Sequence, residues 1–262
     1  MQGLGPLLDM AVPWMLVVTR VAGLFIFAPM ISSVTLPLRV RALIAATIGA
    51  AATPVVIAAS PGGVAVGPID LVSLPWLLLS ETMIGLSMGL IAAVPILALD
   101  LAGVLIGHQM GLNLARVYNP ESDAEIDALG QVLFFVGFAA YVAIGGVDML
   151  FLTLLSTFDR VPIGSFGVEG LPMETLVGVL SGGLELAVRV AAPVWGVIAA
   201  ILVVVGLLGK FLPQMNTMTV GFMLKILVGI MVLALSMRTI GEVSVEFITD
   251  TLGEVSRWAS TL

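Results

Sequence analysis

Six long runs of apolar residues constrain this chain more than any other feature of its sequence. They cover residues 10–30, 41–59, 73–99, 129–158, 175–209 and 217–237. An α-helix of about 20 apolar residues crosses a hydrocarbon core of about 30 Å. The runs are continuously apolar rather than alternating, which argues against barrel strands. The pattern therefore predicts an all-α integral membrane protein with about six long apolar helices.

The scarcity of charge excludes a soluble globular protein. Charged residues make up 10% of the chain and apolar residues 60%, whereas soluble domains contain about 25% charged residues. So few charges cannot cover a water-exposed surface of this size, so lipid must surround part of it. The net charge of -7 comes with no basic run, so we expect no nucleic acid partner. Because cysteine is absent, disulfides and thiolate metal sites are excluded.

Helix breakers lie inside three of the apolar runs, at Pro13, Pro95 and Pro193. Proline removes a backbone donor and clashes one turn back, so we expect these helices to be kinked or broken. A seventh, shorter apolar stretch covers residues 101–115. Together with Pro95 it predicts a short helical hairpin whose tip reaches only part of the way across the membrane.

The end of the chain has a different pattern from the apolar runs. Residues 241–262 mix apolar and charged side chains, which predicts a C-terminal amphipathic helix lying at the periphery. No internal repeat and no long linker divides the sequence. We therefore predict a single membrane-embedded domain over residues 1–262.

Six charged residues lie well inside the apolar runs. They are Arg20, Glu81, Asp148, Glu185, Arg189 and Lys225. Each charge costs about 2.5–3.5 kcal/mol at the centre of a membrane helix. Glu185 and Arg189 are four residues apart and can pair on one helix face. The others must meet another helix, a water-filled cavity or another subunit, and we predict that all six contribute to subunit packing.

Glycines recur every four residues in three of the apolar stretches. They are Gly85 with Gly89, Gly103 with Gly107 and Gly111, and Gly178 with Gly182. This spacing places them on one helix face, where small residues let two backbones approach closely in a membrane. We predict helix packing, including subunit packing, at Gly85, Gly89 and Gly103.

No catalytic constellation is present in the sequence. His108 is the single histidine, so a two-histidine zinc helix is impossible. The sequence also lacks a phosphate-binding glycine loop and a nucleophilic serine in a recognisable motif. We expect no enzymatic activity, no metal and no cofactor.

Six segments of the chain follow one another in a characteristic order and spacing, namely 20–29, 36–41, 102–111, 118–120, 213–216 and 221–226. Together they resemble one known family, the FliR family of export gate subunits and its injectisome counterparts. Glu81 with Gly85 and Gly89 is similar to a further helix of the family. The resemblance covers nearly the whole chain and is closest to the flagellar branch.

The resemblance implies a core subunit of the flagellar type III protein export gate. Such a subunit forms a hetero-oligomer with two sister membrane subunits, FliP-like and FliQ-like, in the bacterial inner membrane at the flagellar basal body. Unfolded exported proteins pass through the resulting channel with the help of FlhB-like and FlhA-like export proteins. The family also contributes a loop that plugs the closed channel, which here falls around residues 107–127.

The plug residues implied by the resemblance follow the glycine triple. They are Gly107, His108, Gln109, Met110, Gly111, Leu112 and Asn113. Met110 and Leu112 are apolar and suit the sealing of a narrow pore, because Met adapts to irregular gaps. His108 departs from the uncharged residue expected at its place. This difference predicts a mild pH sensitivity of the plug.

One other class of protein stays open at this point. A small-solute permease or channel would use the same intramembrane charges as its own substrate or ion pathway. Internal inverted repeats would favour such a permease, and the sequence shows none. The two readings differ for Glu81, whose neutralisation would alter coupling in a permease but assembly in a gate subunit.

Overall fold

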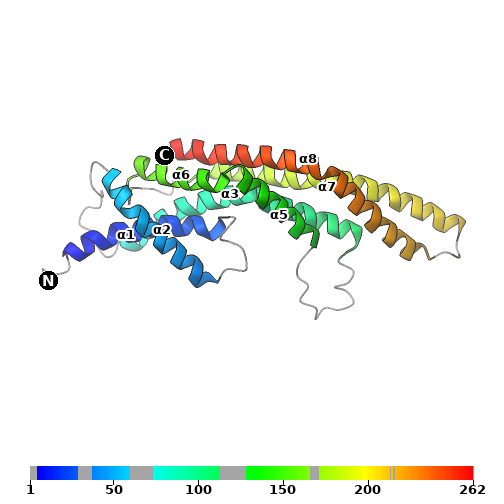
Figure 1. Ribbon diagram of the computed structural model, residues 1–262, viewed down its shortest axis with the longest axis horizontal. Coiled ribbons are helices and arrows are strands. Elements are labelled where there is room, and N and C mark those ends of the chain that lie inside the picture. Colours follow the sequence, from blue (N-terminus) through cyan, green and yellow to red (C-terminus); the bar gives the residue numbers. More distant parts are fainter. Residues whose placement is uncertain are drawn as a thin grey trace. The chain divides into compact units, whose positions relative to one another are not determined.

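The computed structural model describes residues 5–28, 37–59, 73–112, 128–165, 171–212, 214 and 216–261 (Figure 1). These residues form seven helices and no strand, which confirms the predicted all-α class. The helices are α1 (Gly5–Phe27), α2 (Leu38–Ala59), α3 (Leu74–Met110), α5 (Ala128–Ala143), α6 (Gly146–Arg160), α7 (Met173–Phe211) and α8 (Thr217–Thr261).

Four of these helices are long and apolar enough to cross a membrane, namely α2, α3, α7 and α8. α5 and α6 together form a fifth candidate span, and α1 contains a shorter apolar helix, Ala11–Phe27. The described chain therefore has four to five candidate spans and one shorter apolar helix, close to the predicted six. The prediction of an integral membrane protein is confirmed.

Hydroxyl groups inside the apolar helices bond to their own helix. Thr53 donates to the Gly49 carbonyl at 2.7 Å, and Ser87 donates to the Met83 carbonyl at 2.8 Å. Such bonds to the carbonyl one turn back are the local alternative to a water partner. They let a polar side chain sit in an apolar helix without an unsatisfied donor.

The predicted short hairpin around residues 95–115 is wrong, because α3 is one continuous helix from Leu74 to Met110. Pro95 lies inside it, just as Pro13 lies inside α1 and Pro193 inside α7. Membrane helices tolerate proline because neighbouring groups satisfy the freed backbone carbonyl. Residues 113–115 of the predicted hairpin lie outside the described residues.

Two further boundaries differ from the prediction. The run 129–158 breaks into α5 and α6, because Gly145 adopts a φ of 72° that L side chains rarely take. The C-terminal tail is not a separate helix, since α8 continues from Thr217 to Thr261. No proline interrupts that stretch, and extending a helix costs less than nucleating a new one.

The chain divides into two compact units, each made of several sequence segments. The first contains Met1–Val94, Gly145–Leu180 and Ile248–Leu262, and the second contains Pro95–Ile144 and Ser181–Phe247. In the first unit, Leu16 and Leu24 of α1 and Ile84 of α3 are fully buried. Phe25 of α1 meets Phe151 of α6 edge to face, with ring centroids 5.7 Å apart. The prediction of one domain stays a prediction.

The second unit has its own apolar core, built from α3, α5, α7 and α8. Leu99, Ile106 and Met110 of α3 are fully buried in a cluster with Leu133 of α5. The same cluster includes Ala187, Val190, Val194 and Ile198 of α7 and Leu233 of α8. Their spacing of three and four residues along α7 places one face of that helix inward. The opposite face of α7 is exposed over much of its length.

Candidate functional site

A buried ion pair joins α1 to α3 in the first unit. The Nε of Arg20 lies 2.6 Å from Oε2 of Glu81, and neither side chain is exposed (0% for both). An isolated charge in such a place would be strongly disfavoured, so each partner requires the other. Each of these two charges inside the apolar runs therefore finds its partner on another helix of the same chain.

Three further groups contact the Arg20 guanidinium. Its Nη1 donates to Thr157 Oγ1 at 3.1 Å, and its Nη2 donates to the Val161 carbonyl at 3.4 Å. The guanidinium also lies over the Phe158 ring, 4.2 Å from the centroid, in a favourable cation–π position. All three partners belong to the C-terminal end of α6 and the residue that follows it. Arg20 therefore connects α1, α3 and α6.

The second carboxylate oxygen of Glu81 also has a partner. The Gly164 N–H donates to Glu81 Oε1 at 2.9 Å. Gly164 has a φ of 83°, a conformation that glycine adopts without steric cost. Arg20, Glu81, Thr157, the Val161 carbonyl and the Gly164 N–H form what we call the buried charge node. The last three members of the node carry no charge inside an apolar run, so the sequence did not single them out.

The glycines of α3 make the close approach of α1 possible. A Cβ on Gly85 would collide with the Arg20 carbonyl oxygen, and a Cβ on Gly89 would lie 2.5 Å from the Leu24 carbonyl oxygen. Gly23 of α1 has the same relation to the Thr82 carbonyl. The predicted glycine face is therefore used for helix packing within this chain. A role of Gly85 and Gly89 in subunit packing stays a prediction.

Gly103 serves α3 in the same way in the second unit. A Cβ on Gly103 would lie 2.5 Å from the Gly130 Cα, at the start of α5. Asp100 lies one turn before Gly103 and also approaches the start of α5. Its Oδ1 is 2.9 Å from the position that a Cβ on Gly130 would take. A carboxylate at a helix N-terminus is favoured by the helix dipole. Gly103 and Asp100 together position α5 against α3.

Of the remaining four predicted charges, three lie at exposed positions and one is half-buried. Arg189 Nη2 is 2.7 Å from Glu185 Oε1, with side chains 64% and 68% exposed, respectively. Asp148 is exposed in the first turn of α6, because the break at Gly145 places it near a helix N-terminus. Lys225 is half-buried, and among the described residues no carboxylate forms an ion pair with it. Subunit packing by these four side chains stays a prediction.

The described part of the predicted plug is the end of α3. Gly111 has a φ of 83° and closes the helix, with the N–H groups of Gly111 and Leu112 both donating to the Gly107 carbonyl at 3.1 Å. His108 and Gln109 are exposed in this last turn. Asn113 and the rest of the loop to residue 127 lie outside the described residues.

Met110 is fully buried within the second unit, and its expected role in sealing a pore stays a prediction. A Cβ on Gly229 of α8 would collide with the Met110 thioether, so this glycine makes room for it. A glycine inside an apolar run indicates a close contact at position 229, but the sequence does not indicate that its partner is Met110. Met110 fixes the end of α3 to α8.

Comparisons with known proteins give a match to one family and to several named relatives. The family model "Bacterial export proteins, family 1" matches residues 11–251. The chain is 30% identical to the flagellar biosynthetic protein FliR of Aquifex aeolicus over 168 residues, which is 62% of each chain. It is 27% identical to the Escherichia coli FliR over 224 residues, 84% of this chain and 82% of the relative. It is also 25% identical to the surface presentation of antigens protein SpaR of Shigella flexneri over 235 residues, 87% of this chain and 86% of the relative.

Proposed function

This chain belongs to family 1 of the bacterial export proteins, and on that premise we propose that it is a core membrane subunit of a flagellar type III protein export gate. The match along residues 11–251 carries the proposal. The relatives in Aquifex aeolicus and Escherichia coli are named for flagellar biosynthesis. The SpaR relative of Shigella flexneri is named for surface presentation of antigens. The flagellar assignment rests on the FliR names and on the sequence resemblance described above.

Exposed apolar side chains on the α7–α8 pair support a subunit that is surrounded by other membrane components. Val203, Leu207 and Phe211 of α7 and Met223, Leu227 and Leu235 of α8 are each more than half exposed. Contiguous apolar surface on this scale requires lipid or partner helices. We infer that FliP-like and FliQ-like sister subunits cover part of it in a hetero-oligomer of the bacterial inner membrane, at the flagellar basal body.

The channel formed with these sisters would carry unfolded flagellar proteins, with FlhB-like and FlhA-like proteins as neighbours. Residues 107–113 would contribute to its plug, because the helix ends at Gly111 with two exposed polar side chains, His108 and Gln109, just before it. The packing of Met110 against Gly229 would hold the base of that segment in place. An enzymatic step is not part of the proposal.

The state of Arg20 and Glu81 disfavours the permease reading. Both side chains are fully buried and bonded to each other, so they offer no open site to a solute or ion in this chain. A permease would need such charges to line an accessible path. The pair instead behaves as a structural connection among three helices.

Co-expression tests the proposal. We would express the chain with and without its FliP-like and FliQ-like sisters, extract it in mild detergent, and measure the mass of the purified particle. The expected result is a large discrete complex that forms only in co-expression. A monodisperse particle that ignores the sisters would favour a protein that works alone.

A tryptophan scan separates lipid contacts from subunit contacts on the exposed face. Leu227→Trp and Val203→Trp keep the helices apolar, so lipid tolerates them, whereas a packed subunit interface does not. We expect at least one of the two to reduce the yield of the complex without changing the particle formed by the chain alone. Leu227→Met and Val203→Ile are the matched controls, because they alter the volume least. Unchanged complex yield for both Trp variants would place this face against lipid.

A further inference from the structure

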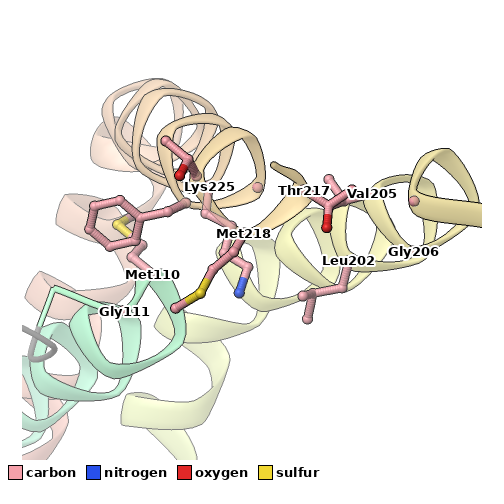
Figure 2. A pocket seen from close by; sticks show the side chains of 12 residues that line it. Met110, Gly111, Leu202, Val205, Gly206, Thr217, Met218 and Lys225 are labelled. Atoms are coloured by element: carbon pink, nitrogen blue, oxygen red, sulfur yellow. The ribbon is translucent and has the colours of Figure 1, made fainter. Parts of the chain in front are cut away.

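The second unit contains a pocket of about 800 Å³ between the last turn of α3, the C-terminal part of α7 and the first turns of α8 (Figure 2). Its walls are mainly apolar and include Met110, Leu202, Met218 and Phe222. Its volume is typical of sites for small molecules, which measure about 300–1,000 Å³. A ligand of this pocket must therefore be largely apolar.

One charged residue, Lys225, lines the pocket. Figure 2 shows its ammonium nitrogen pointing in between the helices, on the same side as Met218. No carboxylate is among the described residues that line the pocket, and Lys225 forms no ion pair within the described part of the chain. A half-buried ammonium among apolar walls is stabilised by an anionic partner.

The positions of the charges along α7 and α8 place the Lys225 ammonium near one boundary of the membrane. No charge occurs at residues 190–209, between Arg189 and Lys210, and Lys225 is the one charge in residues 217–237, before Arg238. Each stretch is about 30 Å long as a helix, which is the thickness of a hydrocarbon core. The turn between α7 and α8 then lies at one boundary, and the exposed pairs Arg189–Glu185 and Arg238–Glu242 lie toward the other.

Lys225 lies eight residues after the start of α8, about 12 Å from that turn. Helical side chains lean toward the helix N-terminus, and lysine extends its ammonium toward the polar interface. The cation is therefore directed to the depth of lipid phosphates, while the apolar walls of the pocket continue toward the hydrocarbon.

We propose that this pocket binds an anionic phospholipid, with its phosphate on the Lys225 ammonium and an acyl chain along Leu202, Met218 and Phe222. The charge complementarity and the apolar walls both fit such an amphiphile. The pocket wall has free space at Gly206, since a Cβ on this exposed residue would meet nothing within 4 Å. The proposal rests on the location of α7 and α8 in the membrane and is independent of the gate function.

Native mass spectrometry of the full-length chain in mild detergent tests this site directly. We would titrate phosphatidylglycerol and phosphatidylcholine with the same acyl chains and compare the binding constants of the first bound lipid. One favourable lysine contact with an anionic lipid predicts a preference for phosphatidylglycerol of about fivefold. Equal binding of the two lipids by the unaltered chain would overturn the proposal.

Charge variants locate the anion. Lys225→Gln is expected to abolish the preference, and Lys225→Arg to keep it. Lys210→Gln is the matched control, because Lys210 is exposed and outside the pocket lining, so the preference should survive there. An equal loss in the Lys210 and Lys225 variants would mean unspecific surface attraction and would refute the site.

A filling variant tests the pocket without touching the charge, and so stays informative even where Lys225→Gln disturbs folding. Gly206→Leu adds a side chain at the pocket lining and is expected to weaken binding of both lipids. Gly196→Leu makes the same change on α7 at an exposed glycine that also has nothing within 4 Å and does not line the pocket. Equal lipid binding by the two variants contradicts the proposal. The proposal is also contradicted if Lys225→Gln reduces only the retention of sister subunits and leaves the lipid preference unchanged. A carboxylate of a partner helix would then be the ligand of Lys225.

Discussion

Replacing Glu81 with Gln tests whether the buried charge node holds the first unit together. Gln keeps the shape of the side chain and a carbonyl oxygen that can still accept from the Gly164 N–H, now 2.9 Å from Oε1. It removes the negative charge that faces Arg20, whose side chain is fully buried. Removing one partner of a buried pair costs about 3–5 kcal/mol. Because Arg20 keeps its contacts with Thr157 and Phe158, we expect a loss near the lower end of that range.

The measurement is the free energy of unfolding in mixed micelles, followed by tryptophan fluorescence as the denaturing detergent increases. Glu185→Gln is the control, because it breaks an exposed pair and should change stability by about 1 kcal/mol at most. The double variant Arg20→Met with Glu81→Gln should be more stable than Glu81→Gln alone, since no buried charge is left. Thr157 stays satisfied in it through the Leu154 carbonyl. Equal effects of Glu81→Gln and Glu185→Gln, or strictly additive single effects in the double variant, would refute the reasoning.

Three other predictions concern single positions. Gly85→Ala should destabilise the fold by about 1–3 kcal/mol or more, because its Cβ collides with the backbone of α1, whereas Gly178→Ala, in open space, should be neutral in the same unfolding assay. Gly164→Ala should cost about 1–3 kcal/mol, since its φ of 83° strains any L side chain; a wild-type midpoint would contradict this. His108→Gln should leave the unfolding midpoint unchanged, because His108 is exposed in the last turn of α3 and exposed substitutions change stability little; a lowered midpoint would contradict this.

The sequence predicted the helices well where a long apolar run leaves no other solution. Each run of about 20 residues must satisfy its backbone internally, so α2, α7 and most of α8 lie where hydropathy puts them. Helix ends and breaks were less predictable. Pro95 was expected to break α3 and does not, whereas Gly145 was overlooked and does interrupt the run, since only a positive φ at that point changes the direction of the chain.

The buried charge node shows which contacts a local sequence pattern can predict and which it cannot. Arg20 and Glu81 could be recognised singly, because a charge inside an apolar run is costly. Their pairing could not be derived, since 61 residues separate them and no periodicity encodes a contact between helices. Thr157 and Gly164 had no signal at all, because a hydroxyl and a backbone N–H are unremarkable in sequence. Glu185 and Arg189 were predictable as a pair, since both belong to one helical turn.

The separation of Arg20 from Glu81 has a consequence for the biosynthesis of the protein. Ribosomes add about 5–20 residues per second, so the 61 residues between the two charges take about 3–12 seconds to synthesise. During that interval α1 carries an arginine without its counter-ion. Entering lipid alone would cost α1 about 2.5–3.5 kcal/mol for this side chain. The first helix is therefore expected to wait beside the aqueous path of the insertion machinery until α3 emerges, and the two helices then leave for the bilayer as a pair.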